Sequence, residues 1–264
     1  MQSERADVTC RACGTATSRY AMSGVVLSHH IDYFECDTCG YLQTEWPFWL
    51  EEAYSRPINT SDTGIVARNV ANARIVLGSL WLLGCLKGRV VDYAGGCGLL
   101  VRMLRDYGVD ALWSDRYCNN ILASGFEHGG EKAELVTAFE AFEHFLDPER
   151  ELGEMIKIAP NILLSTQLIP EPTPAQDAWW YFGKEHGQHI GFFRLSTLEL
   201  LAQKYGKVLW TNGTSYHLLT DSAASNAAWR FVTRFNHLAP LLALGKLRPR
   251  TLADMALMAS RENK

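Results

Sequence analysis

Hydrophobic and polar positions divide the chain into three zones that differ in periodicity. Residues 1–45 contain short runs typical of strands and turns, whereas residues 46–86 carry apolar side chains at helical spacing, as at Val66 and Val70. From Arg89 on, short β-branched runs alternate with helical stretches. The pattern therefore predicts a small N-terminal module, a helical segment and an α/β domain.

The α/β domain is expected to form a doubly wound, mostly parallel, Rossmann-like sheet over residues 87–222, followed by a helical tail over residues 223–264. The expected strands are 89–93, 111–115, 133–139, 161–167, 207–211 and 215–220, and the expected helices are 99–108, 147–159 and 196–206. Asp147 followed by Pro148 is a typical helix start. The last two strands flank Asn212–Gly213, which predicts a hairpin with an antiparallel strand at the sheet edge.

Composition excludes several classes of protein. The 264 residues are 47% hydrophobic and 20% charged, unlike a disordered, collagen-like or coiled-coil chain. The net charge of -4 argues against nucleic acid as a partner, because nucleic acid requires a basic face. The first residues contain no apolar stretch suited to a signal peptide, and the long apolar run Ile75–Leu86 is too short to span a bilayer. We expect a cytoplasmic protein.

Four cysteines form two pairs with the spacing of a zinc ribbon, Cys10-x-x-Cys13 and Cys36-x-x-Cys39, and each pair is followed by glycine. Four thiolates suit tetrahedral zinc and leave no open coordination position, which predicts a structural metal in residues 1–45. Two redox pairs or unligated thiols are the alternative. The other three cysteines lack paired spacing and are expected to be buried as small apolar side chains.

A glycine-rich turn follows the first strand of the α/β domain, in the sequence VVDYAGGCGLLVRML. The helix that begins there offers free amides and a positive dipole end, which suit a ribose or a carboxylate. Val101 breaks the strict dinucleotide pattern G-x-G-x-x-G. Asp115, at the end of the next strand, can accept both hydroxyls of an adenosine ribose. An ordinary strand–helix connection is the alternative.

This turn resembles the first motif of the class I S-adenosylmethionine-dependent methyltransferases, acid-x-G-x-G-x-G. Asp92, Gly96 and Gly98 match it, and Ala94 replaces the first glycine. The resemblance implies S-adenosylmethionine as cofactor. The residues that it places at the cofactor are Asp92, Ala94, Gly95, Gly96, Gly98, Asp115, Arg116 and Glu140.

Further segments are similar to the sugar C-methyltransferases and to the type 23 methyltransferase group, in which a cysteine-rich module precedes the core. Glu143–His144, followed by Asp147–Pro148, looks like the segment after the fourth strand in a large methyltransferase subgroup. Residues 46–86 contain a stretch similar to that group's helical cap, where Tyr54, Asp62 and Arg68 are candidates to close over the cofactor. An exposed polar cap without a ligand is the alternative.

A histidine-rich segment lies between the expected strand 161–167 and the next helix, at the edge where ligands bind in open α/β sheets. Its aromatic run 179–182 is expected to form a wall that excludes water, or to pack on the core. His189 falls on the proposed general base of the sugar C-methyltransferases, while His186 and Gln188 stand where tyrosine and glutamate are usual. The candidate catalytic residues are His189, His186, His144 and Glu143, with structural hydrogen bonding as the alternative for the histidines.

The sequence thus predicts an S-adenosylmethionine-dependent methyltransferase that acts on a sugar, nucleotide-sugar, glycan or related small metabolite. A non-catalytic binding module with a zinc ribbon is the first alternative, and an NAD-dependent oxidoreductase is the second.

The tail alternates apolar residues with arginine and lysine. Such a segment closes a core, forms a dimer seam, or lies on a membrane surface, and we favour the first two. We expect a monomer or a dimer.

Overall fold

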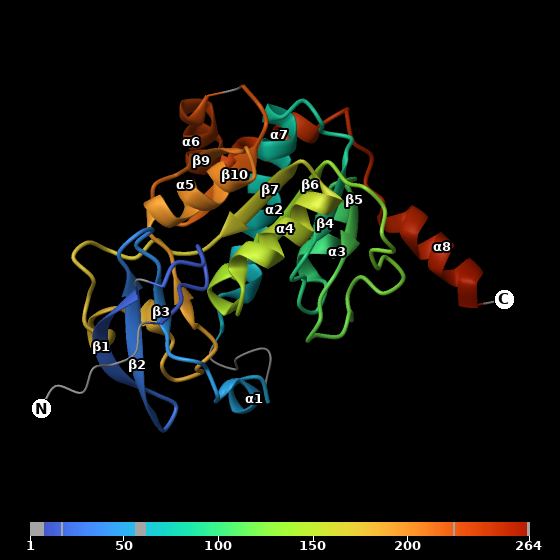
Figure 1. The fold of residues 1–264 in the computed structure, drawn as a ribbon. Coiled ribbons are helices and arrows are strands. Elements are labelled where there is room, and N and C mark those ends of the chain that lie inside the picture. The colour runs from blue at the N-terminus through green and yellow to red at the C-terminus, as the bar shows by residue number, and fades with distance from the viewer. Residues whose placement is uncertain (1–7, 17, 56–61, 224, 263–264) are drawn as a thin grey trace, which may run out of the picture.

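The computed structural model describes residues 8–16, 18–55, 62–223 and 225–262. A six-stranded sheet organises the larger part of the chain (Figure 1). In spatial order its strands are β5 (Asp110–Trp113), β4 (Arg89–Asp92), β6 (Leu135–Phe139), β7 (Asn161–Ser165), β10 (Tyr216–Thr220) and β9 (Val208–Thr211). All neighbours up to β7 pair in parallel, as the alternation of strands and helices predicts.

The antiparallel strand does not lie at the sheet edge, so that expectation was wrong in one detail. The hairpin around Asn212–Gly213 forms, but β10 inserts between β7 and β9 and pairs antiparallel to both. The edge strand β9 therefore runs in the same direction as the parallel strands. An inner position suits β10, because His217, Leu218 and Leu219 are all buried.

Helices cover both faces of the sheet. One face packs against α2 (Ile65–Leu82), α3 (Leu99–Asp106), α6 (Asn226–Arg234) and α7 (Ala239–Ala243), and the other against α4 (Pro148–Ile158) and α5 (Leu195–Lys204). Val90 is buried in the hydrophobic cluster that contains α2 and α3, and its neighbour Val91 in the cluster that contains α4 and α5. Both faces of β4 are thus buried, which explains its continuous β-branched sequence.

The predicted start of α4 is present in the structure. The carboxylate of Asp147 accepts a hydrogen bond from the backbone N–H of Arg150 at 3.0 Å, and Pro148 occupies the first turn, where its missing N–H costs nothing. This cap fixes the end of the segment that carries Glu143 and His144, which form a short 3-10 helix, η1 (Phe142–His144).

The N-terminal module is a second, four-stranded antiparallel sheet. It contains β1 (Ser18–Val26), β2 (His29–Cys36), β3 (Leu42–Thr44) and β8 (Gly191–Phe192). The last strand comes from the histidine-rich segment, so the module extends beyond residues 1–45. The short α1 (Leu50–Ala53) follows it, and the 3-10 helices η2 (Gln176–Ala178) and η3 (Trp180–Phe182) precede β8.

The tail contributes to the core and then leaves it. Trp229 and Val232 of α6 and Ala239 of α7 are buried in the cluster around α2, which fits the expectation that the tail closes the core. After η4 (Asn236–Leu238) and α7, the chain reaches α8 (Thr251–Glu262), which projects from the body beside α3 (Figure 1). Within the described part of the chain, no helix is long and apolar enough to cross a membrane.

We expect α8 to depend on one buried ion pair. Arg105 of α3 binds Asp254 through two hydrogen bonds of 2.8 Å, and both side chains are less than one tenth exposed. Asp254→Ala should lower the free energy of unfolding by about 3 kcal/mol in urea denaturation, because the buried guanidinium loses both 2.8 Å hydrogen bonds to this carboxylate and, among the described residues, keeps as an ion pair only the 3.5 Å contact with Asp110. Asp177→Ala is the control, since its partner Lys184 and Asp177 itself are exposed. A change below about 1 kcal/mol for Asp254→Ala would contradict this account.

Candidate functional site

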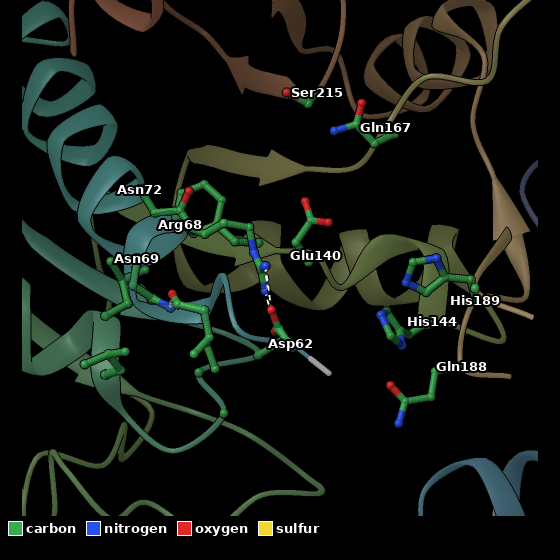
Figure 2. Close-up of a pocket in the computed structure, with 18 of the residues that line it drawn as sticks. Asp62, Arg68, Asn69, Asn72, Glu140, His144, Gln167, Gln188, His189 and Ser215 are labelled. Carbon is green, nitrogen blue, oxygen red and sulfur yellow. Dashed lines mark hydrogen bonds and ion pairs between the residues drawn. The ribbon is translucent and has the colours of Figure 1, made fainter. Parts of the chain in front are cut away.

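A cavity of about 690 Å³ lies at the carboxyl ends of β4 and β6. Its walls come from the first half of α2, the turn after β4, the segment after β6 and the histidine-rich segment between β7 and α5. Figure 2 shows the Asp62–Arg68 pair near the middle of the view, and His144 beside His189 at one end. The location is the one at which open α/β sheets bind ligands.

The glycine-rich turn forms one wall of the cavity through Ala94, Gly95 and Gly96. Gly96 (φ +52°) and Gly98 (φ +88°) adopt left-handed conformations that favour glycine. A Cβ atom on Gly98 would lie 2.5 Å from Oδ1 of Asn120, whereas the space beside Gly96 is open. Since the first N–H groups of α3 have no partner within the helix, the turn offers amide donors to a ligand.

Asp92 lines the cavity at the end of β4. Its Oδ1 accepts a hydrogen bond from the hydroxyl of Thr137 at 2.8 Å. Burial raises the pKa of Asp92 to about 7. Near neutral pH this carboxyl therefore exists in both protonation states and can accept or donate a hydrogen bond to a ligand.

Asp115 lies behind the glycine-rich turn and does not contribute to the cavity lining. Its Oδ2 accepts the N–H of Gly96 at 2.9 Å, and its Oδ1 accepts those of Tyr117 and Cys118 at 2.7 and 2.8 Å. The carboxylate thus stabilises the turn that lines the cavity. Its contact with a ribose stays a prediction.

Three further predicted cofactor residues, Gly98, Arg116 and Tyr54, also lie outside the lining. The guanidinium of Arg116 binds the carboxylate of Glu151 at 2.8 Å. The ring of Tyr54 stacks on Tyr117, and its hydroxyl lies 3.0 Å from Nδ1 of His144. Tyr54 therefore orients a histidine of the cavity.

Asp62, Arg68 and Glu140 do line the cavity. Asp62 and Arg68 form a two-point ion pair of 2.7 and 2.5 Å, and this hydrogen-bonded pairing raises the pKa of Arg68. Of the predicted cap, residues 56–61 lie outside the described residues. Glu140 has a positive φ of 49°, and its Oε1 accepts a hydrogen bond of 2.6 Å from Ser165.

Three histidines form a contiguous cluster at the other end of the cavity. The ring centroids of His144 and His186 each lie 4.8 Å from that of His189. Nδ1 of His189 lies 2.6 Å from the carbonyl oxygen of Tyr181, so it carries the hydrogen and leaves the lone pair on Nε2. Nδ1 of His186 accepts the N–H of Gln188 at 3.1 Å, so its hydrogen is on Nε2.

Burial determines the charge of this cluster. It lowers the pKa of His144 to about 3 and that of His189 well below its ordinary value. Burial also raises the pKa of Glu143 to about 8. Oε1 of Glu143 accepts a hydrogen bond of 2.5 Å from the hydroxyl of Tyr181, whereas Oε2 is buried without a hydrogen-bond partner among the described residues. The lowered pKa values of His144 and His189 mean that both imidazoles are neutral at neutral pH.

The predicted aromatic wall is present only in part. Trp180 lines the cavity and is 75% exposed. Tyr181 and Phe182 are instead buried in the hydrophobic cluster of the N-terminal module, with Trp179 packed against it. Those three residues fit the alternative of ordinary packing.

The four cysteines of the two pairs converge in the structure, with their sulfur atoms within 4.8 Å of one another. The Sγ atoms of Cys10 and Cys39 are 3.7 Å apart, and those of Cys13 and Cys36 are 3.6 Å apart. A backbone hydrogen bond of 2.8 Å forms the turn in each pair. The N–H of Gly14 donates to the carbonyl oxygen of Cys10, and that of Gly40 donates to the carbonyl oxygen of Cys36. The donor set and the matched turns fit a tetrahedral zinc ion.

A comparison with family models identifies residues 70–212 as a methyltransferase domain, which is more than half of the chain. The chain belongs to the methyltransferase-domain family. The matched segment includes the glycine-rich turn, Glu143 and His144, and the two histidines of the segment after β7.

Solved structures with similar folds include three methyltransferases. CalO1 of calicheamicin biosynthesis, in an S-adenosylhomocysteine-bound form, is 16% identical with a TM-score of 0.41 over 58% of this chain and 54% of its own. Human N-acetylserotonin methyltransferase with bound S-adenosylmethionine is 14% identical (TM-score 0.41; 58% and 52%). A putative O-methyltransferase from Nostoc punctiforme is 12% identical (TM-score 0.43; 64% and 66%). The chain spans about half to two thirds of their lengths. No curated protein matched the chain.

The N-terminal module of this methyltransferase-domain protein orders the histidine-rich segment. Arg11, between the first two cysteines, donates a hydrogen bond of 2.6 Å to the carbonyl of Ile190, and the indole of Trp49 donates one of 2.8 Å to that of Gly187. Gly191 pairs with β3 so closely that a Cβ atom would lie 1.7 Å from the hydroxyl oxygen of Tyr41. The four-cysteine cluster and His189 therefore belong to one connected structure.

Sequence reasoning missed several polar residues of the methyltransferase cavity. Asn69 and Asn72 face it from α2, Gln167 from the segment after β7, and Ser215 and Tyr216 from the start of β10 (Figure 2). No motif marks them, and they meet only because α2 and β10 lie beside β4 and β6 in the fold. The helical phase of Arg68, Asn69 and Asn72 is the signal that would have indicated a polar stripe on α2.

Proposed function

We propose that the chain is an S-adenosylmethionine-dependent methyltransferase that acts on a small polar acceptor, such as a sugar, nucleotide-sugar or glycan. The observation that carries this proposal is the placement of the glycine-rich turn and the histidine cluster across one cavity, in a chain of the methyltransferase-domain family. Methyl transfer requires a binding site for the sulfonium cofactor, alignment of the acceptor, and a route for its proton.

The turn side of the cavity suits the cofactor. Open space beside Gly96 and the amides of the first turn of α3 offer a cradle to a ligand with carboxylate and ribose groups. Asp92 adds a carboxyl at the same wall. S-adenosylmethionine, when bound, supplies a methyl group on a positively charged sulfur.

Polar side chains elsewhere in the lining suit a hydroxylated acceptor. Asn69, Asn72, Gln167 and Ser215 present neutral donors and acceptors, which match the hydroxyl groups of a sugar better than an apolar ring. The volume of about 690 Å³ falls within the range of small-molecule sites, roughly 300–1,000 Å³. Within this proposal, the acceptor proton leaves at the histidine cluster, where Nε2 of His189 supplies the lone pair that we predict as general base.

We also propose that Cys10, Cys13, Cys36 and Cys39 bind a structural zinc ion. The closed four-thiolate set leaves no coordination position for a substrate. The ion therefore stabilises the fold of the module and takes no part in catalysis.

A thermal-shift comparison tests the cofactor assignment. A ligand that binds only the folded state, present at a hundred times its dissociation constant, adds about 2.7 kcal/mol of stability. We expect S-adenosylmethionine and S-adenosylhomocysteine to raise the melting temperature and NAD to leave it unchanged. A shift with NAD alone would support an oxidoreductase instead. No shift with any of the three would support a non-catalytic module.

A further inference from the structure

Three side chains at the end of the cavity have an arrangement that neither the cofactor nor the zinc ribbon uses. A carboxylate oxygen of Glu143 and one ring nitrogen each of His144 and His189 lie within 4.8 Å of one another. Glu143 is fully buried, whereas both histidines line the cavity. The first two residues come from η1 and the third from the segment before β8. The two connections that follow β6 and β7 thus meet at this point.

Each of the three side chains has one atom engaged in a hydrogen bond and a second atom available to a ligand. Nδ1 of His189 donates to the carbonyl of Tyr181, which leaves a lone pair on Nε2. Nδ1 of His144 lies 3.0 Å from the hydroxyl of Tyr54, and in the tautomer that donates to this oxygen Nε2 is likewise left for a ligand. Oε1 of Glu143 accepts the hydroxyl of Tyr181. Its Oε2 has no partner among the described residues, although the atom is buried.

The hydrogen bonds of Nδ1 in the two histidines and of Oε1 in Glu143 follow the usual pattern around a bound metal. Histidine ligands commonly place their second nitrogen against a carbonyl or other oxygen, which fixes the ring orientation, and carboxylate ligands are themselves hydrogen-bonded. Here a single residue, Tyr181, contributes to both, since its carbonyl orients His189 and its hydroxyl orients Glu143.

A neutral carboxylic acid would not satisfy the buried oxygen. A protonated Oε2 would have to donate its hydrogen, and no acceptor lies within hydrogen-bond distance among the described residues. Leaving a buried donor or acceptor unmatched destabilises the folded state. A cation between Glu143 and the two imidazoles removes this cost.

We propose that Glu143, His144 and His189 bind a divalent transition-metal cation whose open coordination positions face the cavity. Two imidazole nitrogens and one carboxylate oxygen are the donor set of many catalytic sites, in contrast to the closed four-thiolate set of the N-terminal module. The three ligand atoms move together by a small amount on binding, since ligand distances of about 2.0–2.2 Å bring neighbouring ligands closer than 4.8 Å.

The role of the cation rests on the proposed function, but it replaces direct proton transfer to His189, because Nε2 of His189 is then a metal ligand. An acceptor hydroxyl that coordinates the cation becomes more acidic and releases its proton to water. The resulting oxygen anion attacks the methyl carbon, and the carbon–sulfur bond breaks with its electron pair retained by sulfur. The products are the methyl ether and S-adenosylhomocysteine. Adjacent sugar hydroxyls would occupy two open positions, which selects for a vicinal diol.

Cobalt(II) binding to the full chain tests this site without any measurement of activity. Protein stripped of metal and dialysed against cobalt should contain about two ions per chain, because the thiolate and imidazole–carboxylate sets bind independently. Only the thiolate site gives intense sulfur-to-metal charge-transfer absorption. Glu143→Gln and His189→Asn should each lower the content to about one ion and leave that absorption unchanged. His237→Ala, an exposed histidine of η4, should keep both ions.

Wild-type protein that takes up only the cobalt ion with thiolate absorption would overturn the proposal, whether or not the variants fold. Variants that keep the full cobalt content would overturn it as well. Calorimetric titration of the same samples with S-adenosylmethionine separates this outcome from the proposed function. Absent cofactor binding refutes the methyltransferase proposal, whereas normal cofactor binding with one cobalt ion refutes only the second metal site.

Discussion

Removal of metal from the four-cysteine cluster should abolish methyl transfer, although the cluster lies outside the cavity. Cys36→Ser is expected to lower the turnover rate by at least about 100-fold, since displacement of a catalytic group by about 1 Å has an effect of this size. A closed four-thiolate site joins the two cysteine-bearing turns, so we expect the stability of the module to depend on the metal.

The physical connection is the set of contacts between the module and the histidine-rich segment. Loss of the metal releases Arg11 from the carbonyl of Ile190 and separates β3 from β8, where Leu42 pairs with Phe192. His189 lies two residues before β8 and loses its fixed orientation. The six-stranded sheet contains no residue of the module and should remain folded.

Hydrogen exchange measured by mass spectrometry checks this prediction. In Cys36→Ser, residues 186–193 should exchange faster than in the wild type, while β4 and β6 should keep their protection. Cys85→Ala is the matched control, because this cysteine lies outside the cluster beside α2. Wild-type turnover and protection in a Cys36→Ser protein without metal would show that the module folds without the ion.

Much of the sheet was predictable because its determinants are local. Val90 and Val91 indicate a strand buried on both faces, and Asp147 with Pro148 indicates the start of α4. The position of β10 was not predictable in this way. A run of apolar residues looks the same whether the strand pairs on one side or both, and only the hydrogen bonds to β7 and β9 distinguish the two cases.

The site was predictable where a motif lies in one stretch of chain, and less so where several stretches converge. The turn from Ala94 to Gly96 and the cluster of His144 with His189 do face one cavity. Asp115 illustrates the limit, because the position after β5 was evident whereas the direction of the carboxylate was not. Two of its three hydrogen bonds to backbone amides depend on how residues 116–118 fold back, and the third comes from Gly96.

Replacement of His189 should lower turnover strongly and leave the cofactor bound. We expect His189→Ala to reduce kcat by about 100- to 10,000-fold, the range lost when a positioned proton acceptor is removed, while the dissociation constant of S-adenosylmethionine changes by less than about twofold. The glycine-rich turn forms a different wall of the cavity and is unaffected.

His189→Asn refines the experiment, because its amide can still donate to the carbonyl of Tyr181 but has no counterpart to Nε2. If the hydrogen bond of Nδ1 were the essential contribution, His189→Asn would restore activity. If the lone pair on Nε2 is essential, as direct proton transfer and the cation site both require, the two variants fail alike. Single-turnover rates with radiolabelled methyl groups, together with calorimetric cofactor titrations, decide between these outcomes.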